Sequence, residues 1–564
     1  MNRKAFLQGS LKAFNGPESP KKVIAPEKLY ENKVLPSFHR NLSGLEPYTG
    51  LFGDAEKLHL LRRTLFGVRK TDLEALKNMN VSDAVAFLLN VPSTPPTGPL
   101  NNYTTLSLID LSVPLGSPWG NAIYGDGTIN AARRTSFKSW WTGLILNQET
   151  NIREKMTFFL HSLIATETDV IGDARFMYKH NALLRSYALG NYKTLIRKVT
   201  VDPGMLVYLN GERNSKAAPD ENYARELQEL FTLGKTNNPN YTEDDVKAAA
   251  KVLTGWVNDR NTIASTLNTA RHDATNKQFS SYYNNKIING GTTQSAINAE
   301  IDELINMIFS KDDVSKYIIR KLYTFFVYYV IDAEVETKVI EPLAQIFSDN
   351  NFELKPVLEA LLSSAHFFEA NTMGGYIKTP LDHIAGTLRS FELHTKPANT
   401  TVTDLYAYWN TIRATMAALQ LDIGDPINVS GWPAFYQAPQ YYEIWINSDT
   451  FPKRVSFCSV LMNNGIRGTK LDVLAYTSTL ANPDNPNALI NELINTHLVF
   501  PLSQKQIDIM KAALLAGQSN DSYWTQAWTT YKANPTLAAN INNVKPKLTA
   551  MYTYFFNLAE FQLC

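Results

Sequence analysis

Apolar residues recur at helical spacing along most of this chain, and this pattern constrains the fold more than any other feature. From Glu56 onward leucine and valine return every three or four residues, beginning with Leu58, Leu61 and Leu65. Such spacing places apolar side chains on one face of a helix. Sustained two-residue alternation, which is typical of half-buried strands, is nearly absent. The sequence therefore predicts a mainly α protein with a large multi-helix body.

The helical pattern has one asparagine-rich interruption, at residues 258–297. Within it, two β-prone runs, Gln278–Tyr283 and Lys286–Ile288, flank Asn284 and Asn285. Short runs around such a pair favour a turn, so at most a short β-hairpin is expected near residues 278–290. Further helices are expected at about 298–309, 312–330, 334–349, 352–364, 377–393, 403–420 and within 451–562.

Breaks in the pattern suggest three parts of the chain. Residues 1–55 have no sustained period and are interpreted as an extended N-terminal arm. Residues 56–465 form the main helical domain, which includes a long Pro/Gly-rich loop at 91–130; a loop of that length is usually functional or wraps the surface. Residues 466–564 are interpreted as a C-terminal helical subdomain packed on the main body.

Composition excludes several classes of protein. Lys and Arg number 54 and Asp and Glu 53, a net charge of +1, so charge gives no support for binding nucleic acid or an anionic membrane. Two cysteines, Cys458 and Cys564, exclude a disulfide scaffold. The most apolar stretch, Leu322–Ile331, is half the roughly 20 residues of a membrane span. No signal peptide is visible, so the chain is expected to be cytoplasmic, or exported with its leader absent.

Known cofactor motifs are absent. Gly234-Lys235-Thr236 resembles the end of a phosphate loop, but Glu229 stands where the upstream glycine is needed. No His-Glu-x-x-His, Gly-x-Ser-x-Gly or dinucleotide fingerprint occurs. The cofactor, and whether a metal is bound, are therefore unknown from the sequence.

The segment Pro219–Gly234 carries the most structured signal, with Asp220 as an expected N-cap and Gly234 as the stop. Its apolar residues fall on one face. The opposite face carries a polar stripe made of Asn222, Arg225, Glu226 and Glu229. The stripe could hold a metal, a polar ligand or a partner's charge, or it could be a solvated face with Arg225 pairing at i±4.

Two further segments contain candidate histidines. His161 lies in a helix that is apolar almost all round, so it is either a hydrogen-bonded core histidine or a ligand and proton carrier. His272 and Asp273 lie in the asparagine-rich stretch, where loop residues often carry function but are more often simply exposed.

Several stretches, in order, resemble the bacterial family catalogued as domain of unknown function 1800. They cover roughly residues 55–460, and their number and order make the resemblance specific. The stretches are Leu60–Gly67, Glu154–Thr157 with His161, Ala188–Tyr192, Pro219–Gly234, Ala249–Trp256, Arg271–Asp273, Asn428–Pro433 and Trp445–Asn447. Leu163 stands where the family commonly has a second histidine, and Asp220 where it commonly has asparagine. The first difference argues against a two-histidine metal site on that helix.

The resemblance implies no established activity. Members are often encoded beside a second family that looks related to sulfatases and alkaline phosphatases, which implies a protein partner, and many relatives are exported. The resemblance also favours one polar site made of Asn222, Arg225, Glu226, Glu229, His161, His272 and Asp273.

Two functions are then open. The first is a binding or assembly protein that works with a separate, sulfatase-like partner through the arm, the long loop and the aromatic residues Tyr436, Tyr441, Tyr442 and Trp445. The second is a hydrolase or metal-assisted enzyme. In it the Glu, His and Asp side chains of the polar site ligate a metal or act as acid and base, and Arg225 binds an anion.

Overall fold

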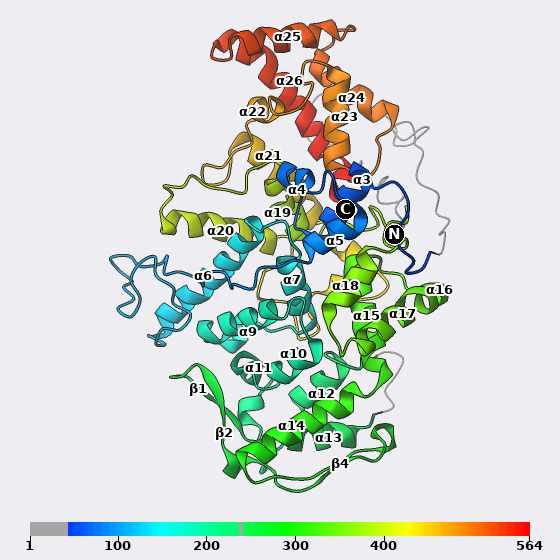
Figure 1. Ribbon diagram of the computed structural model, residues 1–564. Coiled ribbons are helices and arrows are strands. Elements are labelled where there is room, and N and C mark those ends of the chain that lie inside the picture. The colour runs from blue at the N-terminus through cyan, green and yellow to red at the C-terminus, as the bar shows by residue number, and fades with distance from the viewer. Residues whose placement is uncertain (1–42, 236–240) are drawn as a thin grey trace.

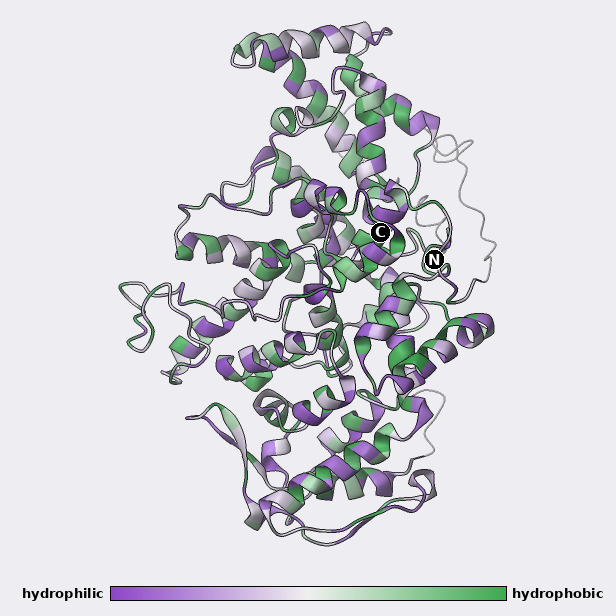
Figure 2. Cartoon of the chain, viewed as in Figure 1, coloured by the Kyte–Doolittle hydropathy of each residue, from purple (hydrophilic) through white to green (hydrophobic). Residues whose placement is uncertain are grey.

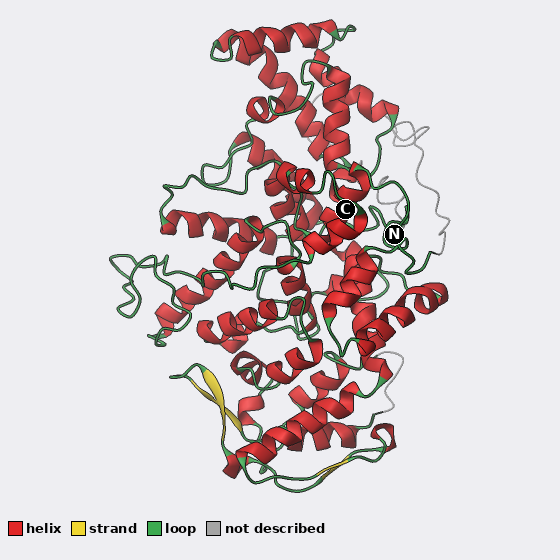
Figure 3. Cartoon of the chain, in the orientation of Figure 1, coloured by secondary structure: helices red, strands yellow, loops and turns green. Residues whose placement is uncertain are grey.

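A computed structural model describes residues 43–235 and 241–564 and consists mostly of helices (Figures 1 and 3), which confirms the mainly α fold class. The α-helices before the first strand are α3 (Asp54–Thr64), α4 (Lys70–Ala75), α5 (Val81–Leu88), α6 (Gly127–Leu146), α7 (Arg153–Leu163), α8 (Thr168–Ile171), α9 (Ala174–Ser186), α10 (Tyr192–Val199), α11 (Pro203–Tyr208), α12 (Asn222–Glu229) and α13 (Glu243–Val252). The α-helices after the last strand are α14 (Gln294–Phe309), α15 (Asp312–Phe326), α16 (Ala333–Val335), α17 (Glu341–Asp349), α18 (Leu354–Leu362), α19 (Pro380–Ser390), α20 (Val402–Ala417), α21 (Thr450–Asn463), α22 (Val473–Thr477), α23 (Pro486–His497), α24 (Gln504–Leu515), α25 (Ser522–Ala533) and α26 (Ala538–Phe556).

Two short antiparallel hairpins are the only sheets in the described residues. Strand β3 (Lys277–Gln278) pairs with β4 (Ile287–Ile288), which is the hairpin expected from the sequence. Strand β1 (Trp256–Asp259) pairs with β2 (Ala264–Leu267), and the sequence analysis did not anticipate this second hairpin. Its strands are four residues long and only partly buried after Trp256, so they carry no alternation of apolar and polar residues to reveal them.

Local side chains set many of the helix starts. Asp126 accepts a hydrogen bond from the Ile129 amide at the start of α6, at 2.8 Å. Thr242 and Asp245 form a reciprocal capping box at the start of α13, in which each side chain accepts from the other's backbone amide. These bonds satisfy amides that have no partner within the helix, so the sequence determines these boundaries locally.

Buried apolar side chains form two hydrophobic clusters. The first lies mainly on α3–α5, α7 and α9–α18, and the second mainly on α6 and α19–α26. Figure 2 shows apolar and polar residues alternating around the helices throughout the molecule, as expected when both clusters are buried between helices.

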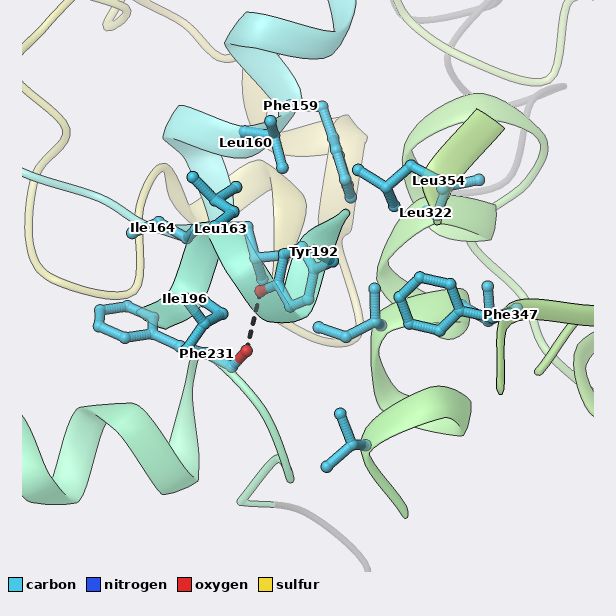
Figure 4. Close-up of a cluster of buried hydrophobic side chains, with 14 of the residues drawn as sticks. Phe159, Leu160, Leu163, Ile164, Tyr192, Ile196, Phe231, Leu322, Phe347 and Leu354 are labelled. Carbon is cyan, nitrogen blue, oxygen red and sulfur yellow. Dashed lines mark hydrogen bonds between the residues drawn. The ribbon is translucent and has the colours of Figure 1, made fainter. Parts of the chain in front are cut away.

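Part of the first cluster surrounds Tyr192 (Figure 4). Its ring packs at 6.3 Å from that of Phe347, and its hydroxyl donates to the Phe231 carbonyl at 2.8 Å. A buried tyrosine hydroxyl needs such a partner. The bond attaches the turn after α12 to α10, at the centre of the cluster.

Helix α7 lies at the boundary of the two clusters. Its Phe159 belongs to the first and its Phe158 to the second, and every residue from Glu154 to Leu163 is buried. Two charges are buried with it, and both are paired with other helices. Glu154 accepts two hydrogen bonds from Arg185 of α9, at 2.8 and 2.9 Å. Lys155 binds Asp382 of α19 at 2.7 Å.

The chain before α3 follows an extended path across the body. The Tyr48 amide donates to the Ser363 carbonyl, and the Ala365 amide donates to the Glu46 carbonyl, at 2.9 and 2.8 Å. Of the arm predicted over residues 1–55, residues 1–42 lie outside the described residues.

The last five helices, α22–α26, extend from one end of the molecule (Figure 1). They contribute to the second cluster together with α19–α21. Helix α26 leads back to the centre, where Leu563 pairs with Ile377 in an isolated bridge. The subdomain interpreted over residues 466–564 therefore shares its hydrophobic core with the main body.

The most apolar stretch, Leu322–Ile331, is split between a helix and the segment that follows, because α15 ends at Phe326. Within residues 43–235 and 241–564, no helix combines the length and the apolar character that a bilayer span requires.

We predict that Glu154→Ala lowers the free energy of unfolding by about 3–5 kcal/mol, because it leaves the buried Arg185 guanidinium without its carboxylate. Urea denaturation followed by circular dichroism measures this change. Glu74→Ala is the matched control, since its pair with Lys77 is 64–69% exposed and its loss should cost less than about 0.5 kcal/mol. Equal effects of the two substitutions would contradict the prediction.

Candidate functional site

A cavity of about 230 Å³ lies where α7, the end of α12, α15 and the loop at 428–436 meet. By the same measure a single water needs only about 10–15 Å³, so the cavity is large enough for a small organic molecule. Three of its four walls lie within or directly beside stretches that carry the family resemblance. Segments far apart in the sequence therefore converge on it.

Two helices form its longest walls. Helix α7 contributes Phe159, Ser162 and Leu163, and α15 contributes Tyr317, Lys321, Thr324 and Phe325. Both sets have the three- and four-residue spacing that places side chains on one face of a helix. The two walls meet where the rings of Phe159 and Phe325 pack edge to face at 5.2 Å.

The third wall depends on Gly431, which holds the loop at 428–436 against α7. Gly431 has φ +90°, and a Cβ atom there would lie 2.5 Å from the Ser162 carbonyl oxygen. Only glycine accepts this conformation and this approach. The next residue, Trp432, stacks on Phe158 at 5.2 Å. Ser430, Phe435 and Tyr436 thereby reach the cavity.

The fourth wall is the end of α12. The regular helix stops at Glu229, earlier than the expected stop at Gly234, because the Phe231 and Leu233 amides donate to carbonyls five residues back. This wider turn ends the four-residue hydrogen-bond ladder. Glu229 and Leu230 line the cavity at this point, and Gly234 then takes a positive φ of 86°.

The polar stripe of α12 is mostly a network of ion pairs. Arg225 pairs with Glu221 at 3.0 Å, with Glu229 at 3.6 Å and with Glu243 at 2.7 Å. Both i±4 pairs considered from the sequence are therefore present. Lys235 binds Glu229 at 3.2 Å. Of the stripe, only Glu229 lines the cavity.

Glu226 lies beside this network. Burial, together with the negative charge of Glu229, raises the pKa of its carboxyl above the ordinary value. Asn222, at the other end of the stripe, is exposed. The stripe thus runs from solvent at Asn222 to the cavity wall at Glu229.

His161 is buried on α7, away from the cavity lining. Its ring packs edge to face on Trp141 at 5.1 Å and lies 5.8 Å from Trp432. Its Nε2 has no hydrogen-bond partner among the described residues. Burial, and to a smaller extent His180, lowers its pKa to about 3, so the imidazole is neutral at pH 7.

His272 and Asp273 belong to a separate network. His272 Nε2 lies 3.0 Å from Glu300 Oε1, and its Nδ1 lies 2.9 Å from the Thr254 carbonyl oxygen. Asp273 accepts two hydrogen bonds from Thr275. Neither residue lines the cavity, so the structure does not place them in one site with Glu229.

The structure adds Lys321, which the sequence analysis did not select. The only signal in the sequence is the position of Lys321 at the edge of the apolar stretch, next to Arg320, with Tyr317 four residues before it and Thr324 three after. These three side chains share the cavity face of α15, but the sequence does not show that a cavity lies opposite them.

The described residues contain no group of three His, Cys, Asp or Glu side chains arranged to hold a metal ion. What the site offers instead is a cavity with aromatic walls, hydroxyl groups and two lysines. It lies inside a mainly helical body whose two hydrophobic clusters meet at α7.

The fold and the cavity define a large helical protein in which widely separated stretches converge on one cavity. The chain matches the model of the family described as protein of unknown function (DUF1800) over residues 59–563. It belongs to this family, as the resemblance indicated. Searches of curated proteins and of solved structures find no match.

The pKa of His161 gives a testable pH dependence. Its folded value, about 3, lies below the unfolded value of about 6.5, so protonation favours the unfolded state. The contribution of neutral His161 to the free energy of unfolding is complete above pH 6.5 and is lost as the pH falls toward 3.

The His161→Gln variant has no imidazole to titrate at this position. Between pH 7 and pH 5 we expect its free energy of unfolding to fall by about 2 kcal/mol less than that of the wild type. Urea unfolding at the two pH values measures the difference, and the remaining histidines, present in both proteins, cancel. An identical pH dependence of the two proteins would contradict the prediction.

Proposed function

We propose that this chain is a binding or assembly protein that acts with a separate protein partner, of the sulfatase-like kind that the family resemblance suggests. The observation that carries the proposal is the exposed apolar surface of the long loop before α6, here called the apolar loop (residues 91–126). In Figure 1 this loop extends from the body beside α6.

Large apolar side chains are concentrated on the apolar loop. Those that face solvent, with their exposed fractions, are Leu106 (103%), Leu111 (95%), Ile123 (71%), Ile109 (57%) and Leu115 (52%). The only charged residue from 106 to 124 is Asp110, which is buried. Single exposed leucines are ordinary on protein surfaces, whereas several exposed large apolar side chains on one loop without exposed charge, here called the patch, are typical of an interaction site.

The apolar loop is fixed to the body rather than loose. Asp110 forms a buried ion pair with Arg133 of α6 at 2.6 Å and accepts from the Tyr103 hydroxyl at 2.8 Å. The Trp119 indole is buried and donates to Ser136 at 3.0 Å. A loop held in this way loses little conformational entropy when a partner binds, which favours recognition by its protruding side chains.

The patch also specifies the chemistry of the partner surface. Burying each leucine from water is worth about 1.5–3 kcal/mol, whereas the patch offers no exposed charge to steer a charged partner. The complementary surface is therefore an apolar one, with a polar rim.

Affinity purification of the full chain from its native source tests the proposal. We expect a stoichiometric partner, identified by mass spectrometry, to accompany wild type. The triple variant Leu106→Ser, Leu111→Ser, Leu115→Ser should weaken that association at least about a hundredfold, since each leucine removed costs more than 1 kcal/mol.

The control carries serine at three exposed apolar positions elsewhere, Leu51, Ile287 and Leu537, which are 83%, 47% and 49% exposed. It should retain the partner. Recovery of wild type alone, or equal recovery of the partner with both triple variants, would overturn the proposal.

A further inference from the structure

Lys321 differs from the other charged residues of the cavity because it has no counter-charge. Glu229 and Lys235 pair with each other at 3.2 Å. Lys321 is half-buried, and among the described residues no carboxylate lies within ion-pair distance of its Nζ; the Nζ lies 5.4 Å from the centroid of the Tyr317 ring. Burial lowers its pKa to about 8.

An unpaired cation in such a place costs stability unless something compensates it. Its Nζ offers three donors, and the cavity beside it is far larger than a water requires. An anion in the cavity would supply the missing charge and the hydrogen-bond acceptors.

A second donor lies on the opposite loop. The Tyr436 hydroxyl accepts a hydrogen bond from the Asn428 side-chain amide at 3.0 Å, which leaves its own proton free to donate. Tyr436 and Lys321 both line the cavity. Together they provide one charged and one neutral donor, which suits an oxygen anion.

The remaining walls indicate what the anion carries. Phe159, Phe325 and Phe435 surround the cavity, and Phe325 and Phe435 lie 5.4 Å apart. These rings favour an apolar or aromatic group over an inorganic ion. The Glu229 carboxylate in the same cavity repels negative charge, and this repulsion is smaller for a singly charged carboxylate than for a phosphate dianion.

We propose that this cavity binds a small monocarboxylate with an aromatic or aliphatic body, and that Lys321 is its anion-binding residue. This ligand site is separate from the apolar loop and does not depend on the proposed partner.

Calorimetric titration of the full chain with benzoate and with phenylacetate at pH 7 tests the site. We expect saturable binding at one site for wild type. Lys321→Met keeps the apolar stem but removes the charge, and it should bind at least tenfold more weakly. Lys316→Met is the matched control on the same helix, since Lys316 pairs with Glu341; it should bind within twofold of wild type.

The pH dependence gives a second readout. The other titratable groups of the cavity are Glu229, Lys235, Tyr317 and Tyr436; burial raises the pKa of the Tyr317 phenol above its ordinary value, so it stays neutral between pH 7 and pH 9. Because only protonated Lys321 binds an anion, affinity should fall about tenfold between pH 7 and pH 9, as the ammonium of pKa about 8 is lost.

Three outcomes would overturn the proposal: no saturable binding of either acid by wild type, equal binding by Lys321→Met, or equal binding of neutral benzyl alcohol. If Lys321→Met does not fold, Glu229→Gln decides. It removes the competing negative charge and should bind benzoate more tightly than wild type, whereas unchanged or weaker binding would overturn the proposal.

Discussion

The burial of helix α7 is the constraint on which the rest of the structure depends. This helix has no solvated face, so each of its charges must find a partner inside the protein. Arg185 provides one for Glu154 and Asp382 provides one for Lys155. These partners come from two different helices, α9 and α19. The two ion pairs therefore fix how the helices around both hydrophobic clusters are placed.

The candidate site follows from this arrangement. Because α7 separates the two clusters, its surface is shared between them, and Phe325 packs against both. The cavity lies at this junction, where α7, α12 and α15 meet the loop at 428–436, whose Trp432 belongs to the second cluster. Gly431 sets the width of the cavity. The Gly431 backbone lies so close to the Ser162 carbonyl that a residue with a Cβ atom would not fit there.

Much of the fold could be predicted because helical periodicity and helix caps are local. Asp126 and Thr242 start their helices in the structure through hydrogen bonds to amides three residues away. The β1–β2 hairpin could not be predicted, since its short, half-buried strands carry no pattern. Within the site, the Arg225 ion pairs were predictable from i±4 spacing. The pairing of His272 with Glu300 was not, because 28 residues separate them.

The sequence by itself determined the helical class, the family and the stretches that carry the family resemblance, since spacing and motif order are properties of the chain alone. The tertiary structure decided what those stretches do. It placed Glu229 on a cavity wall, His161 in an aromatic core and His272 in a separate network, although the sequence analysis grouped all three in one polar site. It also left Lys321 without a counter-charge beside the cavity. Burial and pairing of a charge depend on neighbours from distant parts of the chain, and only folding brings these together.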